Sequence, residues 1–444
     1  MNILQEFDTI TAIATPIGTG GVGVIRISGD DSFDIIHKIF SKKMLDAGKI
    51  AHGWIVDGDV KIDEVVVLPF RKPNSYTGED VIEIQCHGGI NVVRNILDLV
   101  LKNGARMAER GEFTKRAFLN GKMDLSQAEA VADLIHSKTK QFARQSAKNL
   151  AGVLADKIAE IRKDIFEVLS RIVAGIDFPE DVKEPDYSYL IDEFKKAISK
   201  IDGILSCAQA SDIMRQGVKI AIAGKPNVGK SSLFNTLLNV ERAIVTDIAG
   251  TTRDVLKENL DWDVAITLID TAGIRDNDEV EKVEKIGIEY SKQSVDEADL
   301  VLFLYNAQTG MNDDDISILE LLKDKKHIII ANKCDLTCER KPDVFYLSTV
   351  TKEGMEDLKN KIKQVVCDFS LDDTEFITNK RQQDCLAKAK ESLTAALGAA
   401  EYGELQDLIS IDVKQSLLYL DELTGEVITD EILNNIFDHF CIGK

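Results

Sequence analysis

The chain has 444 residues, of which 44% are hydrophobic and 29% charged, a composition typical of a globular protein with about three domains. Its formal net charge of −21 argues against non-specific coating of nucleic acid, since phosphate binding needs clustered Lys and Arg; a protein this acidic that acts on nucleic acid should carry a small local basic patch or have a basic partner. The first residues lack a signal peptide pattern, and no apolar stretch is long enough to span a membrane. The seven cysteines are scattered and form no CxxC pair, as is typical of a reducing compartment. We therefore expect a cytoplasmic protein without a membrane segment.

Residues 1–119 are predicted to form a small α+β domain. Short β-rich runs at 9–14, 22–27, 65–69 and 81–85 are separated by turns that contain Gly and Pro. Residues 18–23 fit the G-x-G-x-x-G fingerprint of dinucleotide-binding folds, but that fingerprint requires a helix to start there. The following residues read as a strand, so the pattern indicates a glycine turn.

Residues 120–212 are predicted to be helical. Ser126 and Glu129 have the spacing of a capping box at the first helix. A second helix, with apolar residues from Leu154 to Ile172 on one face, should stop before Pro179, and a third is expected at 187–209. Residues 371–444 are helical again, and we expect the two helical segments to pack together because neither has a large core alone.

Residues 213–370 alternate apolar strands with amphipathic helices, which indicates a parallel sheet with helices on both faces. The predicted strands are 218–223, 265–269, 300–305, 327–331 and 344–347. The predicted fold class is therefore multidomain α+β and α/β, with a nucleotide-type domain inserted into a discontinuous all-α domain.

The strongest motif is residues 224–231, Gly-Lys-Pro-Asn-Val-Gly-Lys-Ser, which fit the P-loop pattern G-x-x-x-x-G-K-[ST] between a strand and a helix. The free backbone amides at a helix N-terminus bind negatively charged phosphate groups. Lys230 is expected to reach the β and γ phosphates, and the Ser231 hydroxyl to ligate Mg²⁺.

Three further motifs follow in the order that a GTPase requires. Asp270-Thr271-Ala272-Gly273 ends a strand, where Asp270 can hold the Mg²⁺ shell and the Gly273 amide faces the γ-phosphate. Asn332-Lys333-Cys334-Asp335 ends another, and Asp335 can accept both N1–H and the 2-amino group of guanine, a donor pair that adenine lacks. Ser348-Thr349 fits the position that meets guanine O6. The expected GTP-binding residues are Asn227, Val228, Gly229, Lys230, Ser231, Ser232, Thr246, Asp247, Ile248, Ala249, Gly250, Thr251, Thr252, Asp270, Thr271, Ala272, Gly273, Asn332, Lys333, Asp335, Ser348 and Thr349.

The group that assists hydrolysis is left open. Ile274 stands near the point where Ras-like enzymes keep a water-orienting glutamine. One candidate is an acidic residue on the following helix, Glu284. The alternative is that Glu284 simply lies on the solvent-exposed face of that helix. Another is a monovalent cation beside the side-chain oxygen of Asn227, where K⁺ could sit, and Arg275 is either a stabiliser of the second switch or simply exposed.

Cys441 stands fourth from the end, but the final Lys444 and the absence of a polybasic stretch argue against prenylation. Its two readings are a reactive or substrate-facing thiol and a buried structural cysteine.

The whole chain resembles one family, the tRNA-modification GTPases MnmE, also called TrmE. The specific segments are 14–29, 74–80, His87-Gly88-Gly89, 111–122, the linker 176–179, the switch 246–254 and the terminal 440–444.

The resemblance implies a tetrahydrofolate-binding N-terminal domain through which two chains dimerise, a helical domain in two segments (120–212 and 371–444), and an inserted G domain (213–370). It places 5-formyltetrahydrofolate or a related folate at Arg26, Glu83, Lys122 and Lys444, which suits the carboxylates and the pterin N–H groups of a folate. It assigns Mg²⁺ to Ser231 and Thr252, and K⁺ to Asn227, Thr246, Ile248 and Thr251. It also implies work with a flavoprotein, MnmG (GidA), in a heterotetramer or larger complex that places an aminomethyl-type group on C5 of the wobble uridine of certain tRNAs.

Thr19 and the pair Glu109-Arg110 depart from the family pattern near the expected folate pocket, and Asn306 replaces a common aspartate. Two other functions are kept as alternatives: a ribosome-assembly GTPase that binds ribosomal RNA, for which no basic RNA-binding domain is found, and a GTPase that only dimerises and scaffolds.

Overall fold

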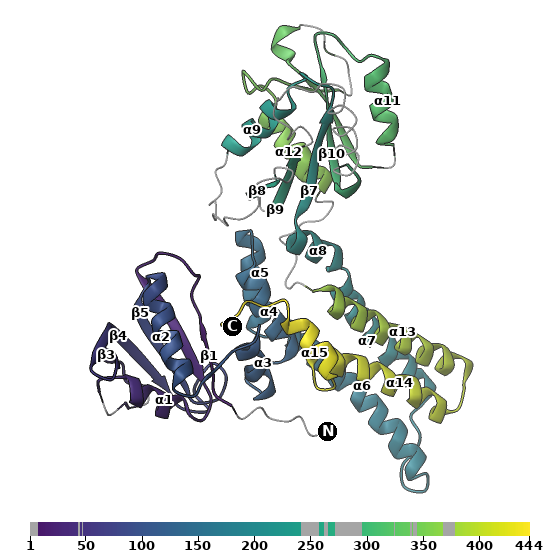
Figure 1. The fold of residues 1–444 in the computed structure, drawn as a ribbon. Coiled ribbons are helices and arrows are strands. Elements are labelled where there is room, and N and C mark those ends of the chain that lie inside the picture. Colours follow the sequence, from purple (N-terminus) through teal and green to yellow (C-terminus); the bar gives the residue numbers. More distant parts are fainter. Residues whose placement is uncertain are drawn as a thin grey trace. The chain divides into compact units, whose positions relative to one another are not determined.

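The computed structural model describes residues 8–42, 45–46, 48–240, 257–261, 265–270, 295–323, 325–337, 340, 344–366 and 378–444. The chain divides into two compact units. The first unit comprises Met1–Ala132, Asn149–Ile201 and Asp384–Lys444, and the second comprises Asp133–Lys148 and Asp202–Gln383. Figure 1 labels their helices and strands.

The first unit contains a six-stranded sheet of order β3-β4-β5-β2-β1-β6. Its strands are β1 (Ile10–Ile13), β2 (Val22–Ser28), β3 (Ala51–Asp57), β4 (Val60–Phe70), β5 (Val81–His87) and β6 (Arg106–Met107). All neighbours are antiparallel except β1 and β6. The turn at 18–23 runs into strand β2, as expected, so the G-x-G-x-x-G pattern does not open a helix.

Helices α1 (Ser32–Ile39) and α2 (Ile90–Lys102) cover one face of this sheet (Figure 1). Alternate strand residues such as Ile25 and Ile84 point into the core beneath them, because side chains alternate along a strand. On the opposite face, Ile10 and Ala12 of β1 pack against Phe113 of α3 (Glu112–Leu119).

The helical segments comprise α4 (Leu125–Ile135), α5 (Lys140–Leu150), α6 (Val153–Asp177), α7 (Tyr187–Leu205), α13 (Lys380–Tyr402), α14 (Gln406–Thr424) and α15 (Asp430–Phe437). α6 packs along α14, and Arg162 pairs with Asp421 between them, which confirms that the two segments pack together. α6 ends at Asp177, two residues before Pro179, as predicted. Limits of the three proposed domains (119, 212 and 370) remain predictions.

The predicted capping box at Ser126 and Glu129 is wrong. Asp124 accepts a hydrogen bond from the Gln127 amide at 2.8 Å, and the Gln127 side chain accepts one from the Asp124 amide at 3.0 Å. Ser126 instead donates to the Asp124 carboxylate. The N-cap is therefore Asp124, two residues before the predicted Ser126. Asp is a favourable N-cap residue, and the Gln127 side chain supplies the reciprocal hydrogen bond of the capping box.

The second unit is built on a sheet of order β12-β11-β10-β7-β9-β8. The strands are β7 (Val218–Gly224), β8 (Lys257–Asp261), β9 (Ala265–Asp270), β10 (Leu300–Asn306), β11 (His327–Asn332) and β12 (Phe345–Leu347). The five predicted strands are parallel to one another, and the unpredicted β8 pairs antiparallel with β9 at the edge.

Helices cover both faces of this second sheet. Ile220 and Ile222 of β7 face a core formed with α8 (Ala208–Gln216), α9 (Lys230–Val240) and α12 (Met355–Val366). Ala221 of β7 faces the other core, against α11 (Asp313–Leu321). Such a doubly covered parallel sheet places its ligand loops at the carboxyl ends of the strands. The third predicted helix at 187–209 is in fact two, α7 and α8.

No described helix is both long and apolar enough to cross a membrane.

Candidate functional site

The P-loop lies between the end of β7 and the start of α9. Gly224 and Gly229 have φ angles of +145° and +100°, which disfavour any residue with a Cβ. A Cβ on Gly224 would lie 2.2 Å from the Leu304 carbonyl oxygen, and one on Gly229 would lie 2.2 Å from Nδ2 of Asn332. The loop therefore wraps closer to its neighbours than other residues allow, and the amides of the first turn of α9 are presented for phosphate binding.

Lys230 and Ser231 begin α9. The Lys230 ammonium donates to the carbonyls of Gly224 at 2.8 Å and Lys225 at 2.7 Å, so it lies inside the loop that it closes. Ser231 and Ser232 are exposed in the first turn. A hydroxyl oxygen at this position is a suitable ligand for Mg²⁺, which prefers oxygen ligands.

The Asn332-Lys333 loop holds the P-loop from the side. Nδ2 of Asn332 donates to the Val228 carbonyl at 2.8 Å, and the Lys333 ammonium donates to the Asn227 carbonyl at 2.9 Å. Asn332 is fully buried, and its Oδ1 has no hydrogen-bond partner among the described residues. Asn227 and Lys333 both adopt left-handed backbone conformations, each with φ +63°, which is uncommon outside glycine. The two loops are therefore held together by direct hydrogen bonds.

The base-recognition residues follow β11 and β12. Asp335 lies in a single 3₁₀ turn, Cys334–Leu336, and is exposed, whereas Cys334 is buried. Ser348 is buried, and its hydroxyl accepts hydrogen bonds from the amides of Val350 at 3.3 Å and Thr351 at 3.2 Å. Ser348 therefore shapes its loop, and its half-buried neighbour Thr349 lies in the turn.

Sequence reasoning missed the anchor of Lys225. Its ammonium pairs with the buried Asp315 carboxylate at 3.0 Å and also contacts Asn312. Asn312 caps α11, so the P-loop is tied to that helix. Asn306, which replaces a common aspartate, accepts from the Gln308 amide at 3.0 Å and thereby stabilises the turn after β10. The Asp-rich run at 313–315 was the available signal, but its contact with Lys225 is non-local.

Several predicted site residues lie outside the described residues. They are Thr246, Asp247, Ile248, Ala249, Gly250, Thr251, Thr252, Thr271, Ala272, Gly273, Arg275 and Glu284. Asp270 is described as the last residue of β9, where its backbone pairs with Ile222.

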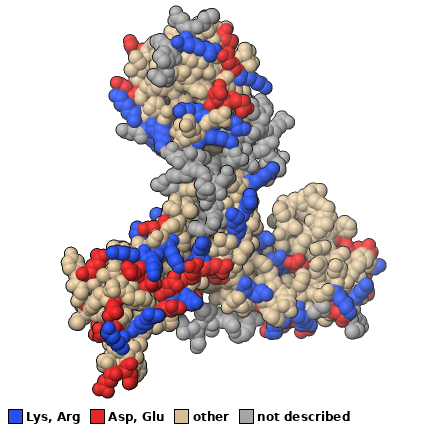
Figure 2. All heavy atoms as spheres, turned by 180° about the vertical axis from the view of Figure 1, so that it is seen from behind, with Lys and Arg blue, Asp and Glu red and all other residues tan. Residues whose placement is uncertain are grey.

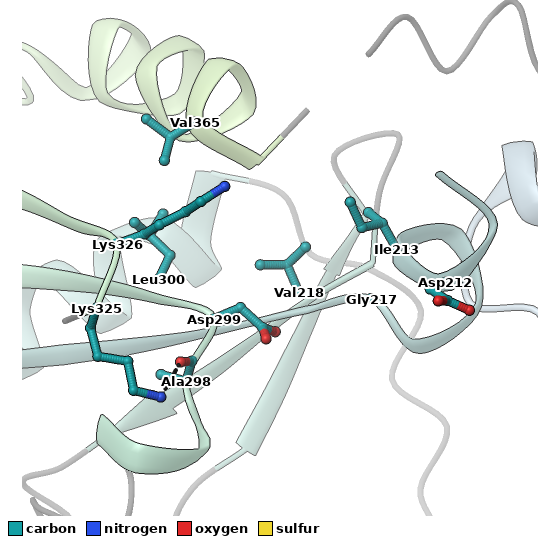
Figure 3. Close-up of a pocket in the computed structure, with 10 residues that line it drawn as sticks. All are labelled: Asp212, Ile213, Gly217, Val218, Ala298, Asp299, Leu300, Lys325, Lys326 and Val365. Carbon is teal, nitrogen blue, oxygen red and sulfur yellow. Dashed lines mark hydrogen bonds between the residues drawn. The ribbon is translucent and has the colours of Figure 1, made fainter. Parts of the chain in front are cut away.

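A cavity of about 500 Å³ lies at the other end of this sheet (Figure 3). Gly217, Val218 and Leu300, at the starts of β7 and β10, line it. Lys325 beside it is held by the Ala298 carbonyl at 3.2 Å. The cavity therefore does not belong to the nucleotide loops.

A second polar group lies in the first unit, on the sheet face opposite α1 and α2. Arg26 of β2 and Glu83 of β5 are direct cross-strand neighbours and form an ion pair at 2.7 Å. The Arg26 guanidinium lies over the rings of Tyr76 at 5.0 Å and Phe113 at 5.6 Å. Its Nη1 is buried without a hydrogen-bond partner in the described structure. Burial raises the pKa of Tyr76, so its hydroxyl stays protonated and contacts Thr114 at 2.9 Å.

The C-terminal residues reach this group. Gly443, with φ +96°, lies so close to β1 that a Cβ would be 2.3 Å from the Ile13 carbonyl oxygen. Burial lowers the pKa of Lys444, and the positive charge of Arg26 lowers it further. Three of the four residues expected at the folate site, Arg26, Glu83 and Lys444, therefore come together. Lys122 is exposed and donates to the Pro73 carbonyl at 3.0 Å, in the segment that leads to Tyr76.

Cys441 is exposed, and its carbonyl accepts a hydrogen bond from the Gly111 amide at 3.4 Å. The alternative of a buried structural cysteine is therefore wrong. The tail is anchored instead by the buried Phe440, whose ring lies 5.0 Å from that of Phe437. A bridge between Arg110 and Ile442 also holds it.

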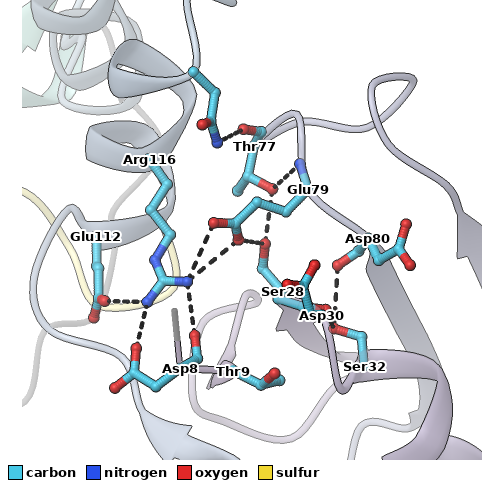
Figure 4. Close-up of polar contacts among 12 residues, drawn as sticks. Asp8, Thr9, Ser28, Asp30, Ser32, Thr77, Glu79, Asp80, Glu112 and Arg116 are labelled. Carbon is cyan, nitrogen blue, oxygen red and sulfur yellow. Dashed lines mark hydrogen bonds and ion pairs between the residues drawn. The ribbon is translucent and has the colours of Figure 1, made fainter. Parts of the chain in front are cut away.

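A charge network centred on the buried Arg116 and Glu112 fixes α3 and the loop that carries Tyr76 (Figure 4). Arg116 pairs with Glu112 at 2.9 Å, with Asp8 at 2.9 Å and with Glu79 at 3.3 Å. Glu79 in turn accepts a hydrogen bond from Ser28 at 2.7 Å. Burial alone would raise the pKa of Glu112, but the guanidinium groups of Arg106 and Arg116 lower it overall. Segments 74–80 and 111–122 were recognised in the sequence, but this pairing was not foreseen.

The turn at 18–23 lines a smaller cavity of about 290 Å³ with Gly88 and Arg94. A Cβ on Gly88 would lie 2.4 Å from the Gly20 carbonyl oxygen. Close approach to the backbone of Gly20 therefore explains Gly88, whereas a Cβ on Gly18 or Gly21 would lie in open space.

Two family models match most of the chain. Residues 125–441 match the MnmE helical domain, and residues 9–122 match the N-terminus of the GTP-binding protein TrmE. Among individual relatives, the tRNA modification GTPase MnmE of Thermoanaerobacter pseudethanolicus is 45% identical over 99% of this chain and 100% of its own length. The protein of that name from Clostridioides difficile is 44% identical over 98% of this chain and 99% of its own length, and the one from Streptococcus thermophilus is 42% identical over 100% of both.

Solved structures similar to part of the chain include the G domain of the FeoB iron transporter from T. maritima. It is 30% identical over 33% of this chain and 98% of its own, with a TM-score of 0.26. Era from Aquifex aeolicus bound to GDP and AlF4⁻ is 26% identical over 39% of this chain and 66% of its own, with a TM-score of 0.28.

Proposed function

Because this chain belongs to the family of tRNA modification GTPases named MnmE, we propose that it uses GTP hydrolysis to drive modification of C5 of the wobble uridine in certain tRNAs. The chain is a GTP-hydrolysing, tRNA-modifying enzyme. The finer proposal adds a flavoprotein partner of the MnmG type, a tetrahydrofolate one-carbon unit, K⁺ stimulation and a homodimer. The result would be an aminomethyl-type group on the uridine, with its carbon from the folate and its nitrogen from an amine co-substrate.

One observation carries the GTPase assignment. The Asn332-Lys333 loop is bonded directly to the P-loop carbonyls of Val228 and Asn227. This arrangement fixes the distance between the phosphate-binding amides and Asp335, which follows two residues later. A carboxylate there can accept two donors from guanine, and pairing of this kind discriminates strongly against a base that lacks them.

The described loops fit GTP and Mg²⁺. Positive φ at Gly224 and Gly229 brings backbone amides close to where phosphates would lie, and Lys230 supplies a positive charge within the loop. Ser231 offers a hydroxyl oxygen to Mg²⁺, which would neutralise charge developing on the phosphates. Thr252 is proposed as the second Mg²⁺ ligand, from the switch segment 246–254.

Hydrolysis is proposed to depend on K⁺. Asn227 is exposed, and its backbone carbonyl is taken by Lys333, so its side-chain oxygen is the group left for a cation. Thr246, Ile248 and Thr251 are proposed to complete that site, where a fixed positive charge would act as an arginine finger does. Glu284 and Arg275 remain the alternative sources of assistance.

The folate is proposed to bind over the Arg26 group. The buried, unpartnered Nη1 of Arg26 is a charged donor that a ligand carboxylate or carbonyl could satisfy. Tyr76 and Phe113 offer aromatic surface beside it, Glu83 offers an acceptor for pterin N–H groups, and Lys444 adds a second positive charge. Lys122 is proposed to act at the edge of this pocket.

Reconstitution tests the proposal. Purified protein, the flavoprotein partner, unmodified tRNA, GTP, Mg²⁺, K⁺, methylenetetrahydrofolate as the carbon source and an ammonium salt as the nitrogen source would be combined, and the nucleosides would be analysed by mass spectrometry. We expect an aminomethyl-type wobble uridine that disappears when any one of the protein, GTP or folate is omitted. Modification that continues without folate would overturn the folate proposal alone. A normally modified wobble uridine in cells that lack the protein would overturn the proposed function. GTP-dependent co-sedimentation of the protein with ribosomes would favour the rRNA-binding alternative.

A further inference from the structure

Helix α5 is basic in a strongly acidic chain. The whole chain has 75 acidic and 54 basic residues, yet no Asp or Glu occurs between Asp133 and Asp156. Within that stretch lie Lys138, Lys140, Arg144 and Lys148. An acid-free, basic segment in such a chain indicates a local site for a negatively charged partner.

The fold gathers three of these charges on one face. Lys140, Arg144 and Lys148 are spaced by four residues, so they project from successive turns, about 6 Å apart along the axis. The opposite face is anchored by Phe142, which is 3% exposed and packs in the core with Ala210 and Met214 of α8. Figure 2 shows Lys and Arg side chains gathered over this helix.

These charges have no acidic partner within the part of the chain that the structure describes. Lys140 and Arg144 are exposed, Lys148 is half-buried, and none forms an ion pair with a described residue. Helix α7 provides the contrast. Lys195 pairs with Glu401 at 3.1 Å, Lys196 with Glu193 at 2.7 Å, and Lys200 with Glu160 at 2.6 Å.

We propose that the α5 basic face (Lys140, Arg144 and Lys148) binds the phosphate backbone of RNA. This inference rests on the proposed function, because tRNA is the substrate that would be bound. Lys and Arg are the side chains that contact phosphates, and the Arg fork can bind two phosphate oxygens at once. The deep, narrow major groove of an RNA helix excludes a protein helix, so the face would track phosphates without reading sequence.

RNA fits this face better than an acidic protein does. Between the three charges the helix presents Gln141, Ala143 and Ala147, which are small or polar. Protein interfaces generally have aromatic or large aliphatic anchors at their centre, and this face has none.

The test compares two variants of the full-length protein with equal charge change. Lys140→Gln/Arg144→Gln/Lys148→Gln removes the α5 basic face. Lys195→Gln/Lys196→Gln/Lys200→Gln removes three lysines that already have carboxylate partners. Binding to transcribed tRNA is measured by fluorescence anisotropy over a range of KCl concentrations, and GTP turnover confirms that each variant is folded.

We expect the α5 variant to bind tRNA about 30-fold or more weakly in 0.1 M salt, with the slope of log K against log[KCl] reduced by about 2 to 3. The α7 variant should change affinity less than about threefold. Equal binding by wild type and the α5 variant overturns the inference and leaves the proposed function intact. Loss of binding to the flavoprotein with unchanged tRNA binding also overturns it, in favour of an acidic protein partner. Absence of tRNA binding by wild type, with normal wobble modification in cells lacking the protein, counts against the proposed function itself.

Discussion

At the scale of single residues, the nucleotide site depends on two side chains that donate hydrogen bonds to P-loop carbonyls. Asn332, the buried last residue of β11, donates to the Val228 carbonyl, and the adjacent Lys333 donates to the Asn227 carbonyl. Asp335 is exposed and takes no part in these two hydrogen bonds. Replacing it should therefore alter the base preference without disturbing the contact between this loop and the P-loop.

Asp335→Asn should therefore shift preference from GTP towards xanthosine triphosphate. The amide side chain cannot accept both guanine donors, and losing hydrogen bonds to a charged acceptor costs about 1.5–3 kcal/mol, or roughly 10- to 150-fold in affinity. Affinities for both nucleotides are measured by titration calorimetry, with Asp313→Asn, an exposed carboxylate at the start of α11, as the control. Retained GTP preference would show that Asp335 does not read the base.

Cys441 is exposed in a tail held by its neighbours, so replacing it should not loosen the tail. Cys441→Ser is expected to reduce tRNA modification at least tenfold while GTP turnover stays within about twofold. Modified nucleosides are quantified by mass spectrometry. Cys207→Ser, a half-buried cysteine whose thiol contacts the Gly203 carbonyl, is the control and should match wild type. Unchanged nucleoside levels in the Cys441 variant would remove any chemical role for this thiol.

At the scale of elements, α3 is held to the sheet by buried charge as well as by Phe113. Glu112 is 3% exposed and pairs with Arg106 at 2.7 Å and Arg116 at 2.9 Å. The negative charge of Glu112 compensates the two guanidinium groups beside it. Neutralising this carboxylate leaves their positive charge uncompensated in a buried site, which is destabilising.

Glu112→Gln should lower the free energy of unfolding of this domain by about 3 kcal/mol at pH 7. The pKa of Glu112 is lowered in the folded state, so its contribution is complete above the usual value of 4.5 and is lost as the pH falls below 4.5 towards the folded value. The gap between wild type and variant should therefore narrow in acid.

Urea unfolding in a Trp262→Phe background, which leaves Trp54 of β3 as the reporter, measures this gap at pH 7 and pH 3.5. The exposed neighbour Glu109→Gln should match wild type at both pH values. A gap that is constant with pH would mean that the charge of Glu112 does not contribute.

Two of the elements that the sequence patterns did not predict are the edge strands β8 and β6. β8 contains Lys257, Glu258, Asn259 and Asp261, residue types of low β propensity, and among the described strands it pairs with β9 alone. Because the connection to β9 is short, the pairing must be antiparallel. β6 has two residues, too few for any periodic signal.

At the scale of the whole molecule, the nucleotide site and the Arg26 group belong to different compact units. The nucleotide site and the proposed folate site are therefore built on separate cores. Communication between them is proposed to run through the dimer and its K⁺-dependent cycle.

GTP turnover should accordingly be at least tenfold faster in KCl than in matched NaCl. It should also rise with protein concentration, because the proposed mechanism brings two G domains together. Turnover is measured by phosphate release over a range of protein concentrations, and Asn227→Ala should remove the salt difference while retaining nucleotide binding. Equal rates in both salts would move the assisting group to Glu284, Arg275 or an outside partner.

The sequence alone determined the nucleotide chemistry, since the P-loop and the Asn332–Asp335 motif are local patterns whose spacing and flanking strands are written in adjacent residues. It also predicted the five parallel strands of the second sheet and the helical segments, because hydrophobic periodicity is local. Only the tertiary structure decided that Arg116 joins Asp8, Glu79 and Glu112, and that the basic face of α5 has no acidic partner among the described residues. These features depend on contacts between residues far apart in the chain or on which face of a helix is buried, and packing, not local pattern, sets both.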